Sequence, residues 1–167
     1  EAHPTRIELL FELLAGAKPG EKRAPLHTFD ALRQRVAADR AAFWREVLGL
    51  HATIREWYDD PKLYHKVGYL IAEGTYLVEL INDAKSTSRS AFRASLDERI
   101  RDGIKLTRSQ AEALRYDKPT EYPKCARLLH LTNVLTVMDL THSSERYPFD
   151  THKKQQWSLE HIHAQNA

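Results

Sequence analysis

Residues 39–58, DRAAFWREVLGLHATIREWY, decide the fold class of this 167-residue chain. Asp39 can cap the N-terminus of a helix, because aspartate is one of the preferred N-cap residues. Behind it, apolar side chains return every three or four positions, which is the spacing of one helix face. They are Phe43, Trp44, Val47, Leu48, His51, Ile54, Trp57 and Tyr58. The stretch predicts a long central helix, with Trp44, Trp57 and Tyr58 in the core rather than in a base-reading cage.

Helical spacing continues on both sides of this stretch. Upstream, an amphipathic helix over residues 7–14 is expected to end at Gly16, and Thr28 is placed to cap the next helix. Downstream, helices are predicted over residues 61–73, 75–84 and 89–104. The fold class is therefore expected to be all-α, an irregular multi-helix bundle.

The second half of the chain carries two further helix signals. Thr107 and Gln110 have the spacing of a capping box, which predicts a brief helix. Pro119 and Pro123 bracket a loop. From Leu128 onward, leucines and valines surround most of a helix, which we expect to be buried on several sides.

Composition limits the compartment and the partners. Hydrophobic residues make up 42% of the chain, enough for one domain with a sizeable core, and no apolar run approaches the length of a membrane span. Cys125 is the single cysteine and cannot form an internal disulfide. We expect a soluble, cytoplasmic protein with no membrane partner. The formal net charge of +2 does not by itself argue for nucleic-acid binding.

Residues 157–163 are the only stretch with period-two alternation, and they predict a short strand-like stub. We divide the chain into a helical domain, 1–145, and a linker with the incomplete start of a second domain, 146–167. A carboxylate next to an imidazole, as in Glu160-His161, suits metal-assisted phosphodiester hydrolysis. Because neighbouring strand residues point to opposite faces, a bulge or turn would have to redirect one of the two.

Two other interpretations of these histidines stay open. The chain has nine histidines, so a His-X-His pair arises easily by chance, and the cluster can be an exposed tail. The second interpretation is a zinc site, formed by His142 and His152 with His161 and His163. The spacing of these four residues fits no standard structural zinc pattern.

The residues around this pair resemble a known family. The C-terminal motif resembles the entry into the C-terminal HNH-like (His-Me finger) domain of GmrSD-type restriction endonucleases. It consists of Trp157, Glu160-His161-Ile162 and Gln165-Asn166, and it is preceded by residues 146–150 and by Lys153-Lys154. Residues 5–14 and 57–70 are similar to segments of the helical region that precedes the nuclease in that family. The resemblance covers nearly the whole chain, and the C-terminal motif is its most specific part.

The resemblance implies a DNA endonuclease that defends against phage and other foreign, including modified, DNA. In it His161 matches the general base, Glu160 matches a ligand of a Mg or Mn ion, and His163, Gln165 and Asn166 support the site. His163-Ala164 departs from the family, which often has an apolar residue and a proline there. Because the downstream ligand-bearing helix is missing, we expect this fragment alone to be inactive. A nucleotide would bind only through an N-terminal domain that the chain lacks.

A basic stripe offers a route to double-stranded DNA. Five side chains recur at multiples of four, within a region of seven basic and three acidic residues: Lys85, Arg89, Arg93, Arg101 and Lys105. Such a stripe spirals slowly and can follow a phosphate backbone. We favour the alternative of a solvated helix face on which Asp97 pairs with Arg93 and Arg101.

The remaining polar residues favour structural roles. His51, His65 and His130 lie among apolar neighbours, which predicts hydrogen-bonded core histidines. The alternative to a nuclease is therefore a non-catalytic helical scaffold or protein-interaction domain. The sequence leaves the oligomeric state open, a homo-oligomer included.

Overall fold

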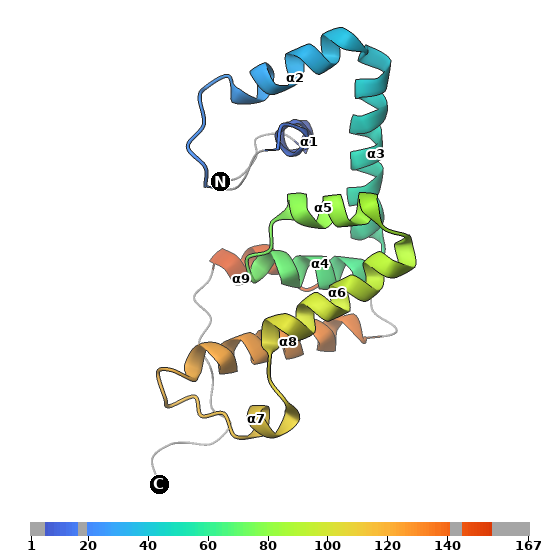
Figure 1. Cartoon of the computed structure of the whole chain (residues 1–167). Coiled ribbons are helices and arrows are strands. Elements are labelled where there is room, and N and C mark those ends of the chain that lie inside the picture. Colours follow the sequence, from blue (N-terminus) through green and yellow to red (C-terminus); the bar gives the residue numbers. More distant parts are fainter. Residues whose placement is uncertain (1–5, 17–19, 141–144, 155–167) are drawn as a thin grey trace. The chain divides into compact units, whose positions relative to one another are not determined.

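The computed structural model describes residues 6–16, 20–140 and 145–154. Over these residues the chain forms helices α1 to α9 and no strand (Figure 1). The prediction of an all-α fold is therefore confirmed for the described part of the chain. The strand-like stub predicted at residues 157–163 lies outside it.

The helices belong to two compact units, Glu1–Asp60 with Gly74–Phe92 and Pro61–Glu73 with Arg93–Ala167. The helices of the first unit are α1 (Arg6–Leu14), α2 (His27–Ala38), α3 (Arg40–Asp59) and α5 (Leu77–Ser86). Helix α6 (Arg89–Ile104) begins in the first unit and continues in the second. The other helices of the second unit are α4 (Pro61–Ala72), α7 (Arg108–Glu112), α8 (Tyr122–Met138) and α9 (Phe149–Lys154).

In the first unit, α1, α2 and α3 pack against one another. The predicted cap of α3 is confirmed, because the Ala42 N–H donates to the Asp39 carboxylate at 2.8 Å. Trp57 is buried and stacks on Phe92, with ring centroids 5.1 Å apart. The predicted cap at Thr28 is wrong, because α2 already begins at His27.

The apolar face of α3 is only partly covered. Val47, Leu50 and Trp57 are buried, whereas Trp44 and Tyr58 are about half exposed and His51 is exposed. The predictions that Trp44, Tyr58 and His51 lie in the core are therefore wrong. The face predicted from spacing spans a wider arc of the helix than its neighbours cover.

In the second unit, α4 packs against α8 and α9. Pro61 is the first residue of α4, as predicted. The chain turns after this helix at Gly74, whose φ of 99° favours glycine.

Two local predictions in this unit had opposite outcomes. The capping box of α7 is confirmed, with both the Thr107 and the Gln110 side chains accepting backbone hydrogen bonds. Helix α8, however, begins at Tyr122, so Pro123 lies in its first turn rather than in a loop. Only His130 and Val134 of this helix are buried, and Leu129 is exposed, so α8 is not buried on several sides. A proline without an N–H donor is tolerated in a first turn, and this explains the earlier start.

Candidate functional site

The residues predicted to carry catalysis lie outside the described residues. These are Glu160 and His161, with His163, Gln165 and Asn166 as support. Their roles stay predictions. The structure does describe the segment that leads toward them, residues 145–154, and the helical surface on which that segment lies.

A cluster of polar and aromatic side chains lies where this segment meets α4 and α8. We call it the histidine cluster; its members are Glu73, Arg127, His130, Tyr147 and His152. The Nδ1–H of His130 donates to Glu73 Oε1 at 2.8 Å, and Arg127 Nε donates to Glu73 Oε2 at 2.7 Å. The hydrogen bond from His130, and then the Arg127 guanidinium, lower the pKa of the Glu73 carboxyl although partial burial opposes the shift. Glu73 is therefore an ionised carboxylate that holds two partners.

The other side of the His130 ring meets aromatic groups. His130 is only 6% exposed, and its Nε2 atom is buried without a hydrogen-bond partner among the described residues. The ring of His152 stacks on it at 4.1 Å with an interplanar angle of 9°, and the Tyr147 ring lies 5.5 Å away. A carboxylate that orients an imidazole can prepare it as a base. In this conformation, however, the His130 Nε2 atom has no access to a substrate from solvent.

The packing around the histidine cluster shifts the pKa values of three side chains. Desolvation, and then the neighbouring His130, lower the pKa of His152. Burial raises the pKa of Tyr147. Burial, followed by the Glu73 charge, raises the pKa of Tyr69 to about 12. The cluster therefore favours a neutral His152, whose Nδ1 shares a 2.8 Å hydrogen bond with the Tyr147 hydroxyl.

His65 fixes the backbone of the incoming segment. Its Nδ1–H donates to the Pro61 carbonyl at 2.6 Å, and its Nε2 accepts the Tyr147 N–H at 3.1 Å. The Tyr64 hydroxyl donates to the Tyr147 carbonyl oxygen at 3.1 Å. Both backbone polar groups of Tyr147 are thus satisfied by side chains of α4, as buried polar groups require.

A glycine in the middle of α4 makes room for the next aromatic ring. A Cβ atom placed on Gly68 would lie 2.2 Å from Cε2 of Phe149, which no ordinary carbon contact allows. Arg146 adds a cation–π contact, 5.0 Å from the centroid of Tyr64. Three features of α4 therefore hold residues 146–149 in place: the hydrogen bonds of His65, the space above Gly68 that the Phe149 ring fills, and the contact of Tyr64 with Arg146. We call this arrangement the seating of residues 146–149 on α4.

Sequence reasoning found part of this arrangement. His65 and His130 are buried and hydrogen-bonded, so their prediction as core histidines is confirmed. Sequence reasoning missed Glu73, the partner of His130, because the two residues are far apart in sequence. Gly68 was a signal that could have been used, since a glycine inside a helix lowers stability unless a close neighbour needs the space.

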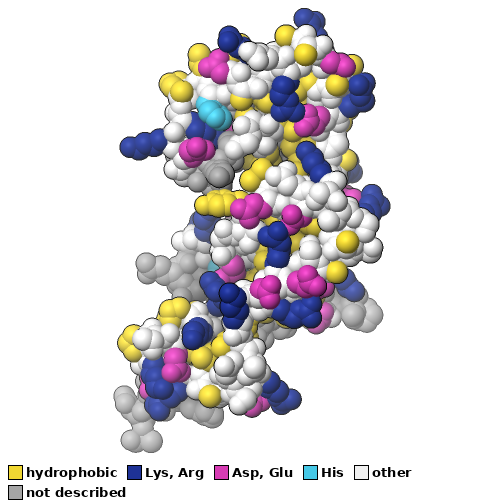
Figure 2. Space-filling view, viewed as in Figure 1, with side chains coloured by type: hydrophobic (Ala, Val, Ile, Leu, Met, Phe, Trp, Pro, Cys, Tyr) yellow, Lys and Arg dark blue, Asp and Glu magenta, His cyan; other side chains and the backbone are white. Residues whose placement is uncertain are grey.

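The basic stripe is placed on two helices and a turn. Lys85 belongs to α5; Arg89, Arg93 and Arg101 belong to α6, and Lys105 follows its end. The Arg89 guanidinium lies 3.2 Å from the Glu56 carboxylate. In Figure 2, Lys and Arg side chains are interspersed with Asp and Glu on the visible face.

Asp97, on the same stretch of α6, is held by another residue. Its carboxylate pairs with Lys66 at 2.6 Å. The partner of Asp97 is thus Lys66 of α4, and not Arg93 or Arg101 as the spacing had predicted.

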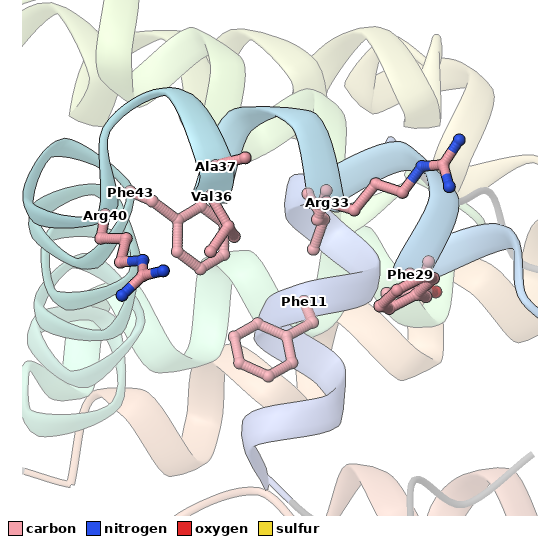
Figure 3. A pocket seen from close by; sticks show the side chains of 9 residues that line it. Phe11, Phe29, Arg33, Val36, Ala37, Arg40 and Phe43 are labelled. Carbon is pink, nitrogen blue, oxygen red and sulfur yellow. The ribbon is translucent and has the colours of Figure 1, made fainter.

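The first unit contains an apolar pocket between α1, α2 and α3 (Figure 3). Its volume is about 530 Å³, and Phe11, Phe29, Val36 and Phe43 form much of its wall. This volume is within the range of ligand-binding pockets, about 300–1,000 Å³. No sequence pattern had singled out this site.

Comparison with models of protein families, with curated proteins and with solved structures finds no match to this chain. Among the described residues, no group of three or more His, Cys, Asp or Glu side chains can hold a metal ion. No helix in the described ranges is long and apolar enough to span a membrane.

Proposed function

We propose that this chain is the helical region of a DNA restriction endonuclease, and that residues 146–167 lead into its metal-dependent nuclease domain. One observation carries the proposal: Trp157, Glu160-His161-Ile162 and Gln165-Asn166 occur together, in the order typical of the GmrSD-type enzymes, after a helical region. The enzyme would act in the cytoplasm on foreign double-stranded DNA.

The proposed chemistry assigns one task to each residue of the central pair. His161 takes the proton of the attacking water, as a general base must. Glu160 holds a Mg or Mn ion, for which a carboxylate oxygen is a suitable donor. The ion supplies charge neutralisation at the scissile phosphate. His163, Gln165 and Asn166 orient this pair.

The contacts of residues 146–149 with α4 support the proposal by tying the segment that precedes the motif to the helical region. Helix α9 ends at Lys154, and Trp157 follows three residues later. The motif therefore follows, within three residues of sequence, a segment that is packed on the helical unit.

A cleavage assay with the full-length gene product tests the metal assignment. We expect supercoiled plasmid to be nicked with Mg²⁺ or Mn²⁺ and not with EDTA. Glu160→Gln is expected to need a higher metal concentration for half-maximal cleavage or to lose activity. Glu79→Gln, an exposed carboxylate on α5, serves as the control and should match the wild type. Identical metal dependence of Glu160→Gln and wild type would remove Glu160 from the site.

The basic stripe is the proposed DNA backbone contact, and it has its own test. Phosphate contacts make affinity fall with salt. We expect the triple variant Arg89→Gln, Arg93→Gln and Arg101→Gln to bind a 30-base-pair duplex more weakly and with a smaller salt slope. A control with the same charge change outside this region is the triple variant Arg45→Gln, Arg55→Gln and Arg115→Gln. An equal loss in both variants would contradict contacts at the stripe.

A second function, a protein-interaction scaffold, is favoured by the apolar pocket of the first unit. An open pocket walled by aromatic side chains is typical of surfaces that accept a partner's side chains. This function needs no catalytic residue, and it is compatible with the helical region acting as one part of a larger assembly.

A further inference from the structure

The pocket of the first unit lies on an incompletely covered helix. Helix α2 has an apolar stripe of Phe29, Leu32 and Val36, at the spacing of one helix face. Only Leu32 is buried, while Phe29 is 62% exposed and borders the pocket. The stripe faces α1, a helix of nine residues, and Phe11 of α1 forms the opposite wall (Figure 3). Leu26, which is 62% exposed, continues this apolar surface beyond Phe29.

The charged side chains that line this pocket are both basic, whereas Glu8, Glu12 and Glu21 line the neighbouring hollow beyond Phe29. Arg33 and Arg40 belong to the lining, which contains no carboxylate. The carboxylate of Asp30 is 3.9 Å from Arg33, and both side chains are 59% exposed, so this pair is weak. Arg40 has no ion pair or hydrogen bond from its side chain within the described ranges. Figure 3 shows Arg40 at the Phe43 end of the pocket and Arg33 toward the Phe29 end.

We propose that this pocket binds an amphipathic helix of a partner protein, with two or three apolar side chains between α1, α2 and α3 and with carboxylates beside Arg33 and Arg40. The occupant is a helix rather than a small apolar acid because the exposed apolar surface extends past the pocket, from Phe29 to Leu26, which is 62% exposed. The partner completes the packing of α2, and its acidic flanks match the two guanidinium groups. This inference does not depend on the proposed nuclease activity.

Fluorescein-labelled peptides of 16 residues test the inference by anisotropy. All carry leucines at positions i, i+3 and i+7 on one face, and their flanking positions hold either glutamate or lysine. We expect the glutamate peptide to bind the full chain at least tenfold more tightly than the lysine peptide. The variant Arg33→Glu with Arg40→Glu is expected to reverse this order, and Ala37→Phe is expected to fill the pocket and weaken binding of both.

Several results would overturn the inference. They are no saturable binding of the glutamate peptide up to 1 mM, equal binding of both peptides, or saturable binding of decanoate without binding of either peptide. The milder variant Arg33→Gln with Arg40→Gln, whose fold is checked by circular dichroism, keeps the test valid if charge reversal unfolds the unit. Plasmid cleavage by the full-length protein with these substitutions should be unchanged, which separates this surface from the nuclease.

Discussion

Replacing Gly68 by alanine tests the seating of Phe149 on α4. Alanine normally stabilises a helix interior relative to glycine, by about 1 kcal/mol. At Gly68, however, the new Cβ atom would lie 2.2 Å from Phe149 Cε2 and 2.7 Å from its Cδ2 and Cζ atoms. Carbon atoms in contact need about 3.5–4.0 Å, so the ring has to leave its place.

The expected cost follows from the burial of that ring. Phe149 is partly buried, so losing its contacts costs less than about 3 kcal/mol, the top of the range for a fully buried Phe side chain. Taking about 2 kcal/mol for its loss and about 1 kcal/mol for the gain in helix propensity, we expect Gly68→Ala to destabilise by about 1 kcal/mol. In a Phe149→Ala background the clash is gone, and the same substitution should stabilise by about 1 kcal/mol.

Urea unfolding followed by circular dichroism measures both values and their difference. The two backgrounds should differ by about 2 kcal/mol, the coupling energy between positions 68 and 149. Gly49→Ala is the matched control, because Gly49 lies inside α3 and a Cβ atom there meets nothing within 4 Å. It should stabilise in both backgrounds. If Gly68→Ala also stabilises the protein that retains Phe149, the seating of residues 146–149 is refuted.

The histidine cluster leads to two further predictions. Glu73→Gln should lower the free energy of unfolding by about 2–3 kcal/mol, because the hydrogen bonds from His130 and Arg127 would no longer end on a charged carboxylate. The control Glu79→Gln, at an exposed position, should change it by less than about 0.5 kcal/mol. Similar urea midpoints for the two variants would contradict the role of Glu73. The pKa of His152 is lowered in the folded state from 6.5, so its contribution is complete above pH 6.5 and is lost as the pH falls through the folded-state value. The stability difference between wild type and His152→Gln should therefore shrink from pH 7.5 to pH 5, and a constant difference would show that His152 is not desolvated.

The sequence predicted those parts of the fold that depend on neighbouring residues. The Asp39 cap, the new helix at Pro61 and the Thr107–Gln110 capping box are all local, and all are observed. Helix spacing also predicted residues 89–104 as a helix, which are the bounds of α6.

Tertiary contacts decided the parts that spacing could not predict. Trp57 is buried whereas Trp44 is half exposed, although both lie on the face predicted to be apolar. Trp57 stacks on Phe92, a ring far along the chain, whereas Trp44 meets the rings of Phe11 and Phe43 edge-on. The pairing of Glu73 with His130 likewise joins residues 57 positions apart, and no local pattern reports it.

The candidate site divides in the same way. Short motifs suggested Glu160 and His161 as catalytic residues, and those predictions stand untested by the described part of the chain. The pocket between α1, α2 and α3 needed the structure, because its walls come from three helices and its exposed Phe29 looks in sequence like an ordinary core residue.

The single-turnover rate of plasmid cleavage by the full-length gene product, compared between wild type and His161→Ala, tests the central claim most directly. A general base contributes about 10²–10⁴-fold to the rate, so we expect a loss of that size, with DNA affinity unchanged. His51→Ala, at an exposed position on α3, should cleave as fast as wild type. Equal cleavage rates for His161→Ala and wild type would contradict the proposed nuclease site.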